Sequence, residues 1–321
     1  MSAYSNSWLE FENALGGIRP VLRGTAPEMR AQYSGLVDLL SPQHPSTRDT
    51  VQVTDGQHGA IAYRIYKPVE AEATVAPVGV FYHSGGLVVG NLDSEDAFCR
   101  QVALRCHVII VSVDYRLSPE HKAPAHVEDA LSILEWTYSN AQAIGGDSSQ
   151  IFVIGSSAGG QLDLAVTRMV ALGQSALPVS SVKGVVALCP VVLHPLDVPE
   201  KYVAGYSSYE EHAENSPVID KTTMLQMFAN TGVSPIDEQY FPVRDDGCLS
   251  LFPPTYIATC GQDPLRDDGA VLHRALSSAS VPIRTQNYKS LPHCFWIVPS
   301  LPETSVFLND LTSGVAWVLE S

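Results

Sequence analysis

Short apolar runs alternate with helix-compatible stretches along most of the chain. The helix-compatible stretches include residues 160–172 and the segment from residue 127 onward. Because apolar strands that alternate with helices are typical of parallel sheets covered on both faces, the pattern predicts an α/β fold with a mostly parallel sheet. Five runs read as strands, and they cover residues 78–82, 108–113, 151–154, 255–261 and 283–288.

The strong strand signals lapse in two places, which divides the chain into a core and a predicted cap. With 321 residues, of which 45% are hydrophobic, the chain can bury one large core, so residues 1–321 are expected to form a single domain. Residues 8–11 and 31–40 look helical. We therefore expect cap elements at about residues 1–48 and 194–247, over the carboxyl ends of the strands, where ligands bind in open sheets.

A Gly-Ser-Ser-Ala-Gly motif directly follows the apolar run 151–154. A strand, a sharp turn and a helix in this order expose the hydroxyl of the central serine, Ser157, at the top of a parallel sheet. Gly155 and Gly159 carry no side chain, so strand and helix can approach closely. Chance matches to this motif are common, and a simple turn of small residues is the alternative. The motif gains weight only from its partners.

A glycine-rich loop, His-Ser-Gly-Gly at residues 83–86, follows the run 78–82. The backbone N–H groups of Gly85 and Gly86, together with that of Ala158 after the serine, would bind the anion that develops during acyl transfer. The alternative is an ordinary Gly-Gly turn. The position of the loop upstream of the serine favours the oxyanion hole.

The remaining partners follow in the chain order serine, acid, histidine. Asp263 leaves the end of the strand-like run 255–261, and His293 lies in a loop after the run 283–288. The chain has 10 histidines, and only His293 has such a serine and acid context. Asp267 and Asp268 are instead expected to start a helix, where carboxylates cap free N–H groups and suit the helix dipole.

Taken together, these motifs resemble the hormone-sensitive-lipase-like branch of the α/β-hydrolases, over roughly residues 60 to 320. The resemblance implies a mostly parallel central sheet with helices on both faces and a helical cap. The motifs that carry it lie at residues 83–86, 114–121, 155–160, 263–267 and 293–295. The roles that it implies are Ser157 as nucleophile, His293 as base, Asp263 as acid, and Gly85, Gly86 and Ala158 as oxyanion donors.

The sequence departs from the family pattern around the site. Ser84 stands where glycine is usual, Ser156 where an acidic residue is usual, and Cys294 where glycine is frequent. Backbone N–H groups survive such changes, so the oxyanion hole remains formable, while the bulk of Ser84 and Cys294 could alter acyl preference or rate. The family also uses the segment 114–130 as a brace behind the oxyanion loop. Structural roles are therefore expected for Arg116, Glu120 and Asp129.

Aromatic residues in the predicted cap are candidates for an apolar wall of the substrate site. As a group they favour an acyl or aromatic substrate over a sugar or a phosphate, although packing inside the cap is the better interpretation for any single one. The candidates are Tyr206, Tyr209, Phe228, Tyr240 and Phe241.

Composition and charge exclude several classes of partner. Nineteen basic against 34 acidic residues give a net charge of −15, which disfavours nucleic acid and anionic membranes. No apolar run reaches the length of a membrane span, and no leader-like segment starts the chain. Six scattered cysteines fit free thiols in a cytoplasmic protein. No ligand spacing indicates a metal, and no organic cofactor is expected.

These observations predict a serine carboxylesterase that hydrolyses a small apolar or aromatic ester through an acyl-enzyme intermediate. A biosynthetic lyase or cyclase of secondary metabolism that uses the same site is one alternative. A non-catalytic receptor for a small molecule is another, although such receptors in the family commonly lose a triad member. A homodimer through the terminal strand and helix is compatible with the sequence.

Overall fold

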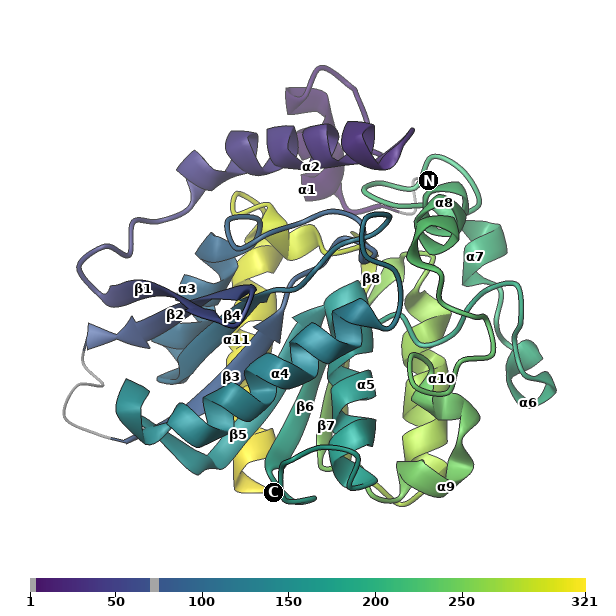
Figure 1. The fold of residues 1–321 in the computed structure, drawn as a ribbon. Helices are drawn as coiled ribbons and strands as arrows, with labels where there is room; N and C mark the ends of the chain where they lie inside the picture. Colours follow the sequence, from purple (N-terminus) through teal and green to yellow (C-terminus); the bar gives the residue numbers. More distant parts are fainter. Residues whose placement is uncertain (1–3, 70–74) are drawn as a thin grey trace.

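An eight-stranded sheet forms the centre of the computed structural model, which describes residues 4–69 and 75–321 (Figure 1). Strand β2 runs antiparallel to its neighbours β1 and β4, and every other neighbouring pair is parallel. The prediction of a mostly parallel sheet is therefore confirmed. In spatial order the strands are β1 (Val51–His58), β2 (Ile61–Pro68), β4 (Ile109–Asp114), β3 (Ala76–Tyr82), β5 (Gly146–Ser156), β6 (Val182–Leu188), β7 (Thr255–Gln262) and β8 (Ile283–Pro292).

All five predicted strands are present, as β3, β4, β5, β7 and β8, although Val108 lies just before β4. Sequence analysis did not single out β1, β2 or β6. Strand β1 forms an edge of the sheet and exposes most of its polar side chains, so it lacks the continuous apolar character of a buried strand.

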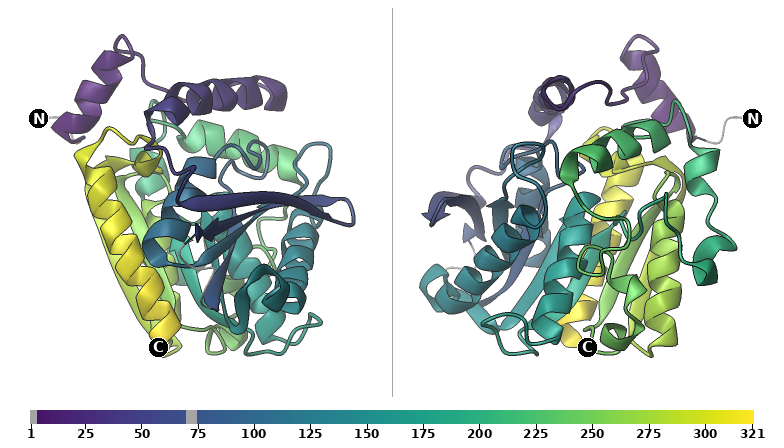
Figure 2. Two further views of the ribbon diagram at one scale, coloured as in Figure 1. Left: turned by 90° about the vertical axis from the view of Figure 1, so that its left-hand side faces the viewer. Right: turned by 45° about the vertical axis from the view of Figure 1, so that its right-hand side comes forward.

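Helices cover both faces of the sheet, as Figure 1 and Figure 2 show. Because side chains alternate along a strand, Val153 of β5 belongs to one hydrophobic cluster and Ile154 to the other. Helices α4 (Ala125–Asn140), α5 (Ala158–Ala171) and α10 (Arg266–Ser278) pack on the first face, and α3 (Asp96–Cys106) and α11 (Pro302–Glu320) pack on the second.

Two segments far apart in the sequence meet above one end of the sheet (Figure 1). The first holds α1 (Asn6–Ala14), α2 (Ala26–Leu40) and the short helix η1 (Ser41–Gln43), and Thr25 with Glu28 forms a capping box at the start of α2. The second holds α6 (Glu200–Val203), α7 (Ser208–Glu211), α8 (Lys221–Thr231), η4 (Pro242–Arg244) and α9 (Asp246–Leu249). Of these, α8 lies near α2, whereas α9 lies toward the opposite end of the sheet (Figure 1). The short helices η3 (Gln142–Ile144) and η5 (Phe295–Ile297) complete the described elements.

The two segments are joined directly. A parallel β-bridge pairs Val21 with Val218, and the Arg23 guanidinium forms an ion pair with the buried carboxylate of Asp220. The carboxylate also accepts hydrogen bonds from the backbone N–H groups of Asn215 and Thr223, which leaves it well compensated for its burial.

Candidate active site

Ser157 occupies the turn between β5 and α5 in a strained conformation, with φ 57° and ψ −114°. Gly155 and Gly159, two residues away on each side, let β5 and α5 approach closely at this turn. A Cβ atom on Gly155 would lie 2.3 Å from the carbonyl carbon of Gly159, and one on Gly159 would lie 1.9 Å from the carbonyl oxygen of Tyr82. The Ser157 N–H donates to the Leu188 carbonyl at 2.8 Å and fixes the turn. The turn has the geometry of a nucleophile elbow.

The imidazole of His293 is oriented by Asp263. Its Nδ1 lies 2.8 Å from Oδ2 of Asp263, and both side chains are buried. The second oxygen of Asp263 accepts a 2.8 Å hydrogen bond from the N–H of Leu265, which fixes the carboxylate at the end of β7. Burial opposes protonation of His293, but the charge and hydrogen bond of Asp263 outweigh it and raise the pKa of the imidazole.

Ser157 and His293 line one small cavity of about 20 Å³. Since Asp263 engages Nδ1, the free nitrogen of the ring is Nε2. No hydrogen bond joins the Ser157 hydroxyl to His293 among the residues that the structure describes; such bonds are often long without substrate and tighten when it binds. The other lining residues are Leu22, Tyr33, Ser84, Gly85, Gly86, Val218, Ile219, Met224, Met227, Cys294 and Ile297.

The loop at residues 83–86 is held by side chains on both sides. The Ser84 N–H donates to Oε2 of buried Glu95 at 2.6 Å, and the Ser84 hydroxyl lies 2.9 Å from the hydroxyl of Tyr33 on α2. The Tyr115 hydroxyl donates to the His83 carbonyl at 2.7 Å. Burial raises the pKa of Glu95, and the hydrogen bond from Ser84 opposes that rise. Ser84 therefore joins the loop to α2.

Two of the candidate oxyanion donors, Gly85 and Gly86, line the cavity, and the third, Ala158, directly follows Ser157. Gly85 and Gly86 have φ values of 121° and 61°, which favour glycine, and a Cβ atom on Gly86 would lie 2.2 Å from Sδ of Met227. In the described part of the chain, the N–H groups of Gly85 and Gly86 donate to no other backbone or side-chain group. The N–H of Ala158 is the first of α5 and has no acceptor within the helix.

The residues predicted to be structural form ion pairs away from the cavity. Arg116 lies 2.8 Å from the buried Asp129, and Glu120 lies 2.6 Å from Arg30 of α2. Arg30 also donates to the carbonyl of Val88, just after the glycine-rich loop, at 2.8 Å. The prediction of a brace behind the loop is confirmed.

Asp267 and Asp268 lie in the first turn of α10, as predicted, but their predicted role as helix caps is wrong. Helix α10 begins at Arg266 without a side-chain cap. The two carboxylates bind other parts of the chain instead. Asp267 accepts hydrogen bonds from the N–H groups of Ser207 and Ser208 at the start of α7, and Asp268 accepts from those of Val192 and Leu193, after β6. Burial raises the pKa of Asp268 to about 7, although these hydrogen bonds oppose the rise.

The aromatic candidates for a substrate wall do not line the cavity. The Tyr206 hydroxyl donates to Asp268 at 2.8 Å, and Phe228 packs against the ring of His194. Tyr209, Tyr240 and Phe241 are buried in the hydrophobic cluster. The wall consists mainly of aliphatic and thioether side chains, together with Tyr33. Tyr33 of α2 and Met224 and Met227 of α8 gave no sequence signal that separates them from ordinary packing residues.

One cluster behind the site has atoms close enough to hold a metal ion. Sγ of Cys189, Sγ of Cys260 and a carboxylate oxygen of Asp263 lie within 4.8 Å of one another, and the two sulfur atoms are 3.4 Å apart. Asp263 is already bonded to His293. Burial raises the pKa of both thiols, which keeps them protonated, whereas metal binding requires thiolates. The cluster therefore fits a packed core better than a metal centre.

Comparison with known proteins agrees with this geometry. Residues 79–297 match a family described as alpha/beta hydrolase fold. The versiconal hemiacetal acetate esterase of Dothistroma septosporum is 39% identical over 98% of this chain and 95% of its own. The hyperthermophilic esterase of Pyrobaculum calidifontis superimposes with a TM-score of 0.85 at 27% identity, over 99% of this chain and all (100%) of the other.

A structure of vibralactone cyclase is also similar, with a TM-score of 0.86 at 25% identity, over 99% of this chain and 96% of the other. The family match, the relative that is similar over nearly the whole chain, and the shared fold agree with one another. The chain belongs to the α/β-hydrolase fold family and is a hydrolase of the carboxylesterase type.

Proposed function

We propose that the protein hydrolyses a short-chain ester through an acyl-enzyme intermediate, with Ser157 as nucleophile, His293 as general base and Asp263 as the acid that orients it. The observation that carries the proposal is the strained Ser157 in one cavity with a histidine whose Nδ1 is bonded to a buried carboxylate. Gly85, Gly86 and Ala158 supply the proposed oxyanion donors.

In the first half of the reaction, Nε2 of His293 takes the Ser157 proton while Oγ attacks the ester carbonyl. The oxyanion accepts hydrogen bonds from the three N–H groups, and the Asp263 carboxylate stabilises the imidazolium. The C–O bond then breaks, and the alcohol leaves with the proton from His293. In the second half, water gives a proton to Nε2 of His293 and attacks the acyl carbon. The bond from that carbon to Oγ of Ser157 then breaks, His293 returns the proton to Oγ, and the acid is released.

The size of the cavity supports a short acyl group. About 20 Å³ is little more than the space that one water occupies, and the wall is apolar. The relative from Dothistroma septosporum is named as an acetate esterase. We therefore propose an acetyl or similarly short ester of a small apolar or aromatic alcohol from secondary metabolism as the substrate.

The test combines active-site labelling with two serine variants. A fluorophosphonate probe is expected to label Ser157, and Ser157→Ala is expected to lose the label and turnover of p-nitrophenyl acetate. Ser156→Ala is the matched control, because Ser156 is the adjacent buried serine at the end of β5. An unlabelled protein that binds a small molecule tightly without turnover would support a receptor instead.

The similarity to vibralactone cyclase favours a second candidate, a lyase or cyclase reaction in the same site. In such a reaction His293 would act as a base on a C–H or O–H group of the substrate, and the donors at the glycine-rich loop would bind an enolate or a tetrahedral oxyanion. Turnover that survives Ser157→Ala but is lost in His293→Ala would favour this candidate over the esterase.

We further propose that residues 1–48 and 194–247 act as a cap within a single domain. Leu22 and Tyr33 from the first segment and Val218, Met224 and Met227 from the second line the cavity, which supports this division. Limited proteolysis with and without a phosphonate inhibitor tests it, because a cap closed over the inhibitor is cleaved more slowly.

A cytoplasmic location and a homodimer are also proposals. In the described residues, no helix is both long and apolar enough to cross a membrane, and the six cysteines are free. Strand β8 forms one edge of the sheet, and its residues Arg284 and Tyr288 bond to α11, so we propose this edge and α11 as the contact with a second copy. Cell fractionation and light scattering after gel filtration test the two proposals.

A further inference from the structure

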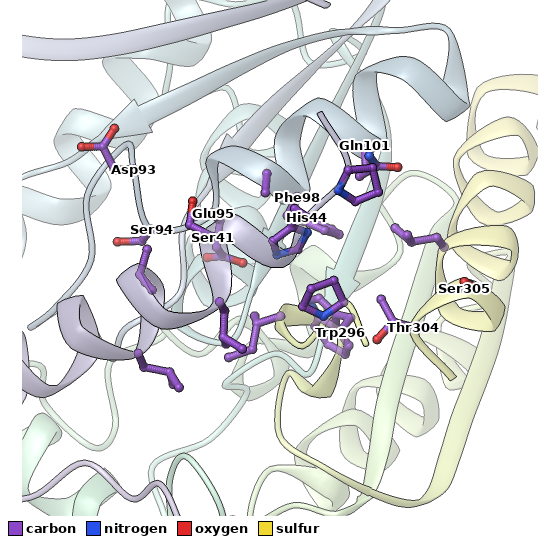
Figure 3. Close-up of a pocket in the computed structure, with 18 of the residues that line it drawn as sticks. Ser41, His44, Asp93, Ser94, Glu95, Phe98, Gln101, Trp296, Thr304 and Ser305 are labelled. Atoms are coloured by element: carbon purple, nitrogen blue, oxygen red, sulfur yellow. The ribbon is translucent and has the colours of Figure 1, made fainter. Parts of the chain in front are cut away.

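A second and larger cavity lies beneath α2. It measures about 120 Å³ and is lined by residues of α2, η1, α3, η5 and α11 and of the loops beside them. Figure 3 shows His44, Phe98 and Trp296, which come from three different parts of the chain, around one space. Most of its wall is apolar, and its main contributors are Leu36, Leu40, Phe98, Trp296, Ile297 and Leu308.

This cavity adjoins the active-site cavity. Tyr33 and Ile297 line both, so these two side chains stand between them. The Tyr33 hydroxyl is bonded to Ser84, which lines the active-site cavity, and Glu95, which accepts from the Ser84 N–H, lines the larger one. Trp296 and Ile297 follow His293 by three and four residues. The segment that follows the catalytic histidine therefore forms part of the wall of the larger cavity.

The chemistry of ester cleavage assigns the two halves of a substrate to different sides. The histidine must protonate the leaving oxygen, so the alcohol leaves on the histidine side, whereas the carbonyl oxygen faces the N–H donors. The active-site cavity has room for a small acyl group only. A cavity of about 150 Å³ lined by aliphatic and aromatic side chains is known to bind benzene, and 120 Å³ is close to that size.

We propose that the cavity beneath α2 receives the alcohol half of the substrate, and that this alcohol carries a single aromatic ring. Tyr33 is then the residue that limits passage between the two cavities, and its bond to Ser84 holds it in place. The inference rests on the proposed esterase function and adds the chemical class of the leaving group. It also gives the serine at position 84 a role that a glycine could not fill.

The experiment compares two esters whose alcohols are alike at the reacting carbon but differ in the ring. Benzyl acetate needs the cavity, and ethyl acetate does not. Leu36→Trp fills the cavity from α2 and is expected to lower the ratio of kcat/KM for benzyl acetate to that for ethyl acetate at least tenfold, mainly through KM. Leu39→Trp is the control, because Leu39 is 47% exposed on the same helix and does not line the cavity.

A second pair of variants covers the case in which Leu36→Trp does not fold. Ser305→Trp fills the cavity from α11, and Val306→Trp, at an exposed neighbouring position, is its control. A ratio within twofold of wild type in both filling variants refutes the proposal while leaving the esterase intact. A wild-type protein that hydrolyses neither ester refutes the proposed function itself.

Discussion

Replacement of Asp263 by asparagine tests the proposed relay at its most buried point. The substitution keeps the volume and the acceptor oxygen but removes the charge 2.8 Å from Nδ1 of His293. The amide group can present an N–H to Nδ1, which favours the tautomer whose Nε2 carries a proton. That tautomer cannot accept the serine proton. The bond from the Leu265 N–H needs only an acceptor oxygen, which the amide retains.

The expected loss in kcat is about 10⁴-fold, or about 5 kcal/mol of transition-state stabilisation, because the same change in a serine protease triad has that effect. The assay is hydrolysis of p-nitrophenyl acetate, with circular dichroism to verify folding. Asp267→Asn is the control, since that carboxylate binds backbone N–H groups outside the cavity. A kcat for Asp263→Asn within tenfold of wild type would refute the proposed role of this carboxylate.

The pH profile provides a second measurement on the same variant. Burial lowers the pKa of His293, but Asp263 raises it by more, so the net shift is upward from the ordinary value of about 6.5. The reaction requires the neutral imidazole, so wild-type kcat/KM is expected to rise with pH through a midpoint above 6.5. In Asp263→Asn the charge is lost, and the midpoint of any residual activity is expected to move to lower pH.

Two further predictions concern the elbow and the glycine-rich loop. Gly159→Ala is expected to lower the free energy of unfolding by about 3 kcal/mol or more, because its Cβ would lie 1.9 Å from the Tyr82 carbonyl oxygen. Gly35→Ala is the control, because Gly35 has open space around it within α2. This variant is expected to raise the free energy of unfolding by up to about 1 kcal/mol. Urea denaturation compares the two, and equal stabilities would contradict the steric argument. Tyr33→Phe and Ser84→Ala are each expected to cost about 1 kcal/mol of stability and to show a coupling of similar size in a double-mutant cycle. Full additivity would show that the hydroxyl pair contributes nothing.

The strands and the catalytic residues that directly follow them could be predicted from the sequence, because local patterns of apolar and polar residues indicate both. Buried parallel strands have continuous apolar runs, so β3, β4, β5 and β7 could be located, together with the loops at their carboxyl ends. Strand β8 was also expected, although it is an edge strand with mostly exposed polar residues. Ser157, Asp263 and His293 each follow one of these strands, and parallel strands bring their carboxyl ends to one edge. The pairing of Asp263 with His293 could therefore be anticipated, and the structure contains it.

Contacts made by the cap could not be predicted in this way. Tyr33 occupies a position in α2 that looks like any apolar position of an amphipathic helix, and only the packed structure places it against Ser84. Asp268 follows a strand and begins a helix, which favoured a capping role, yet its acceptor oxygens serve backbone groups about 75 residues earlier in the chain. Local propensity contains no term for such distant partners.

The bridge between Val21 and Val218, with its ion pair from Arg23 to Asp220, has a consequence for how the protein can change over time. A substitution at one of these positions changes the packing or charge that its partner meets, although the partner lies nearly two hundred residues away in the sequence. In a set of orthologous sequences, positions around 21–23 and 218–220 are therefore expected to covary. Substitutions in the N-terminal segment would thus limit which residues are tolerated near 218–220. The two segments that line the active-site cavity would therefore evolve together.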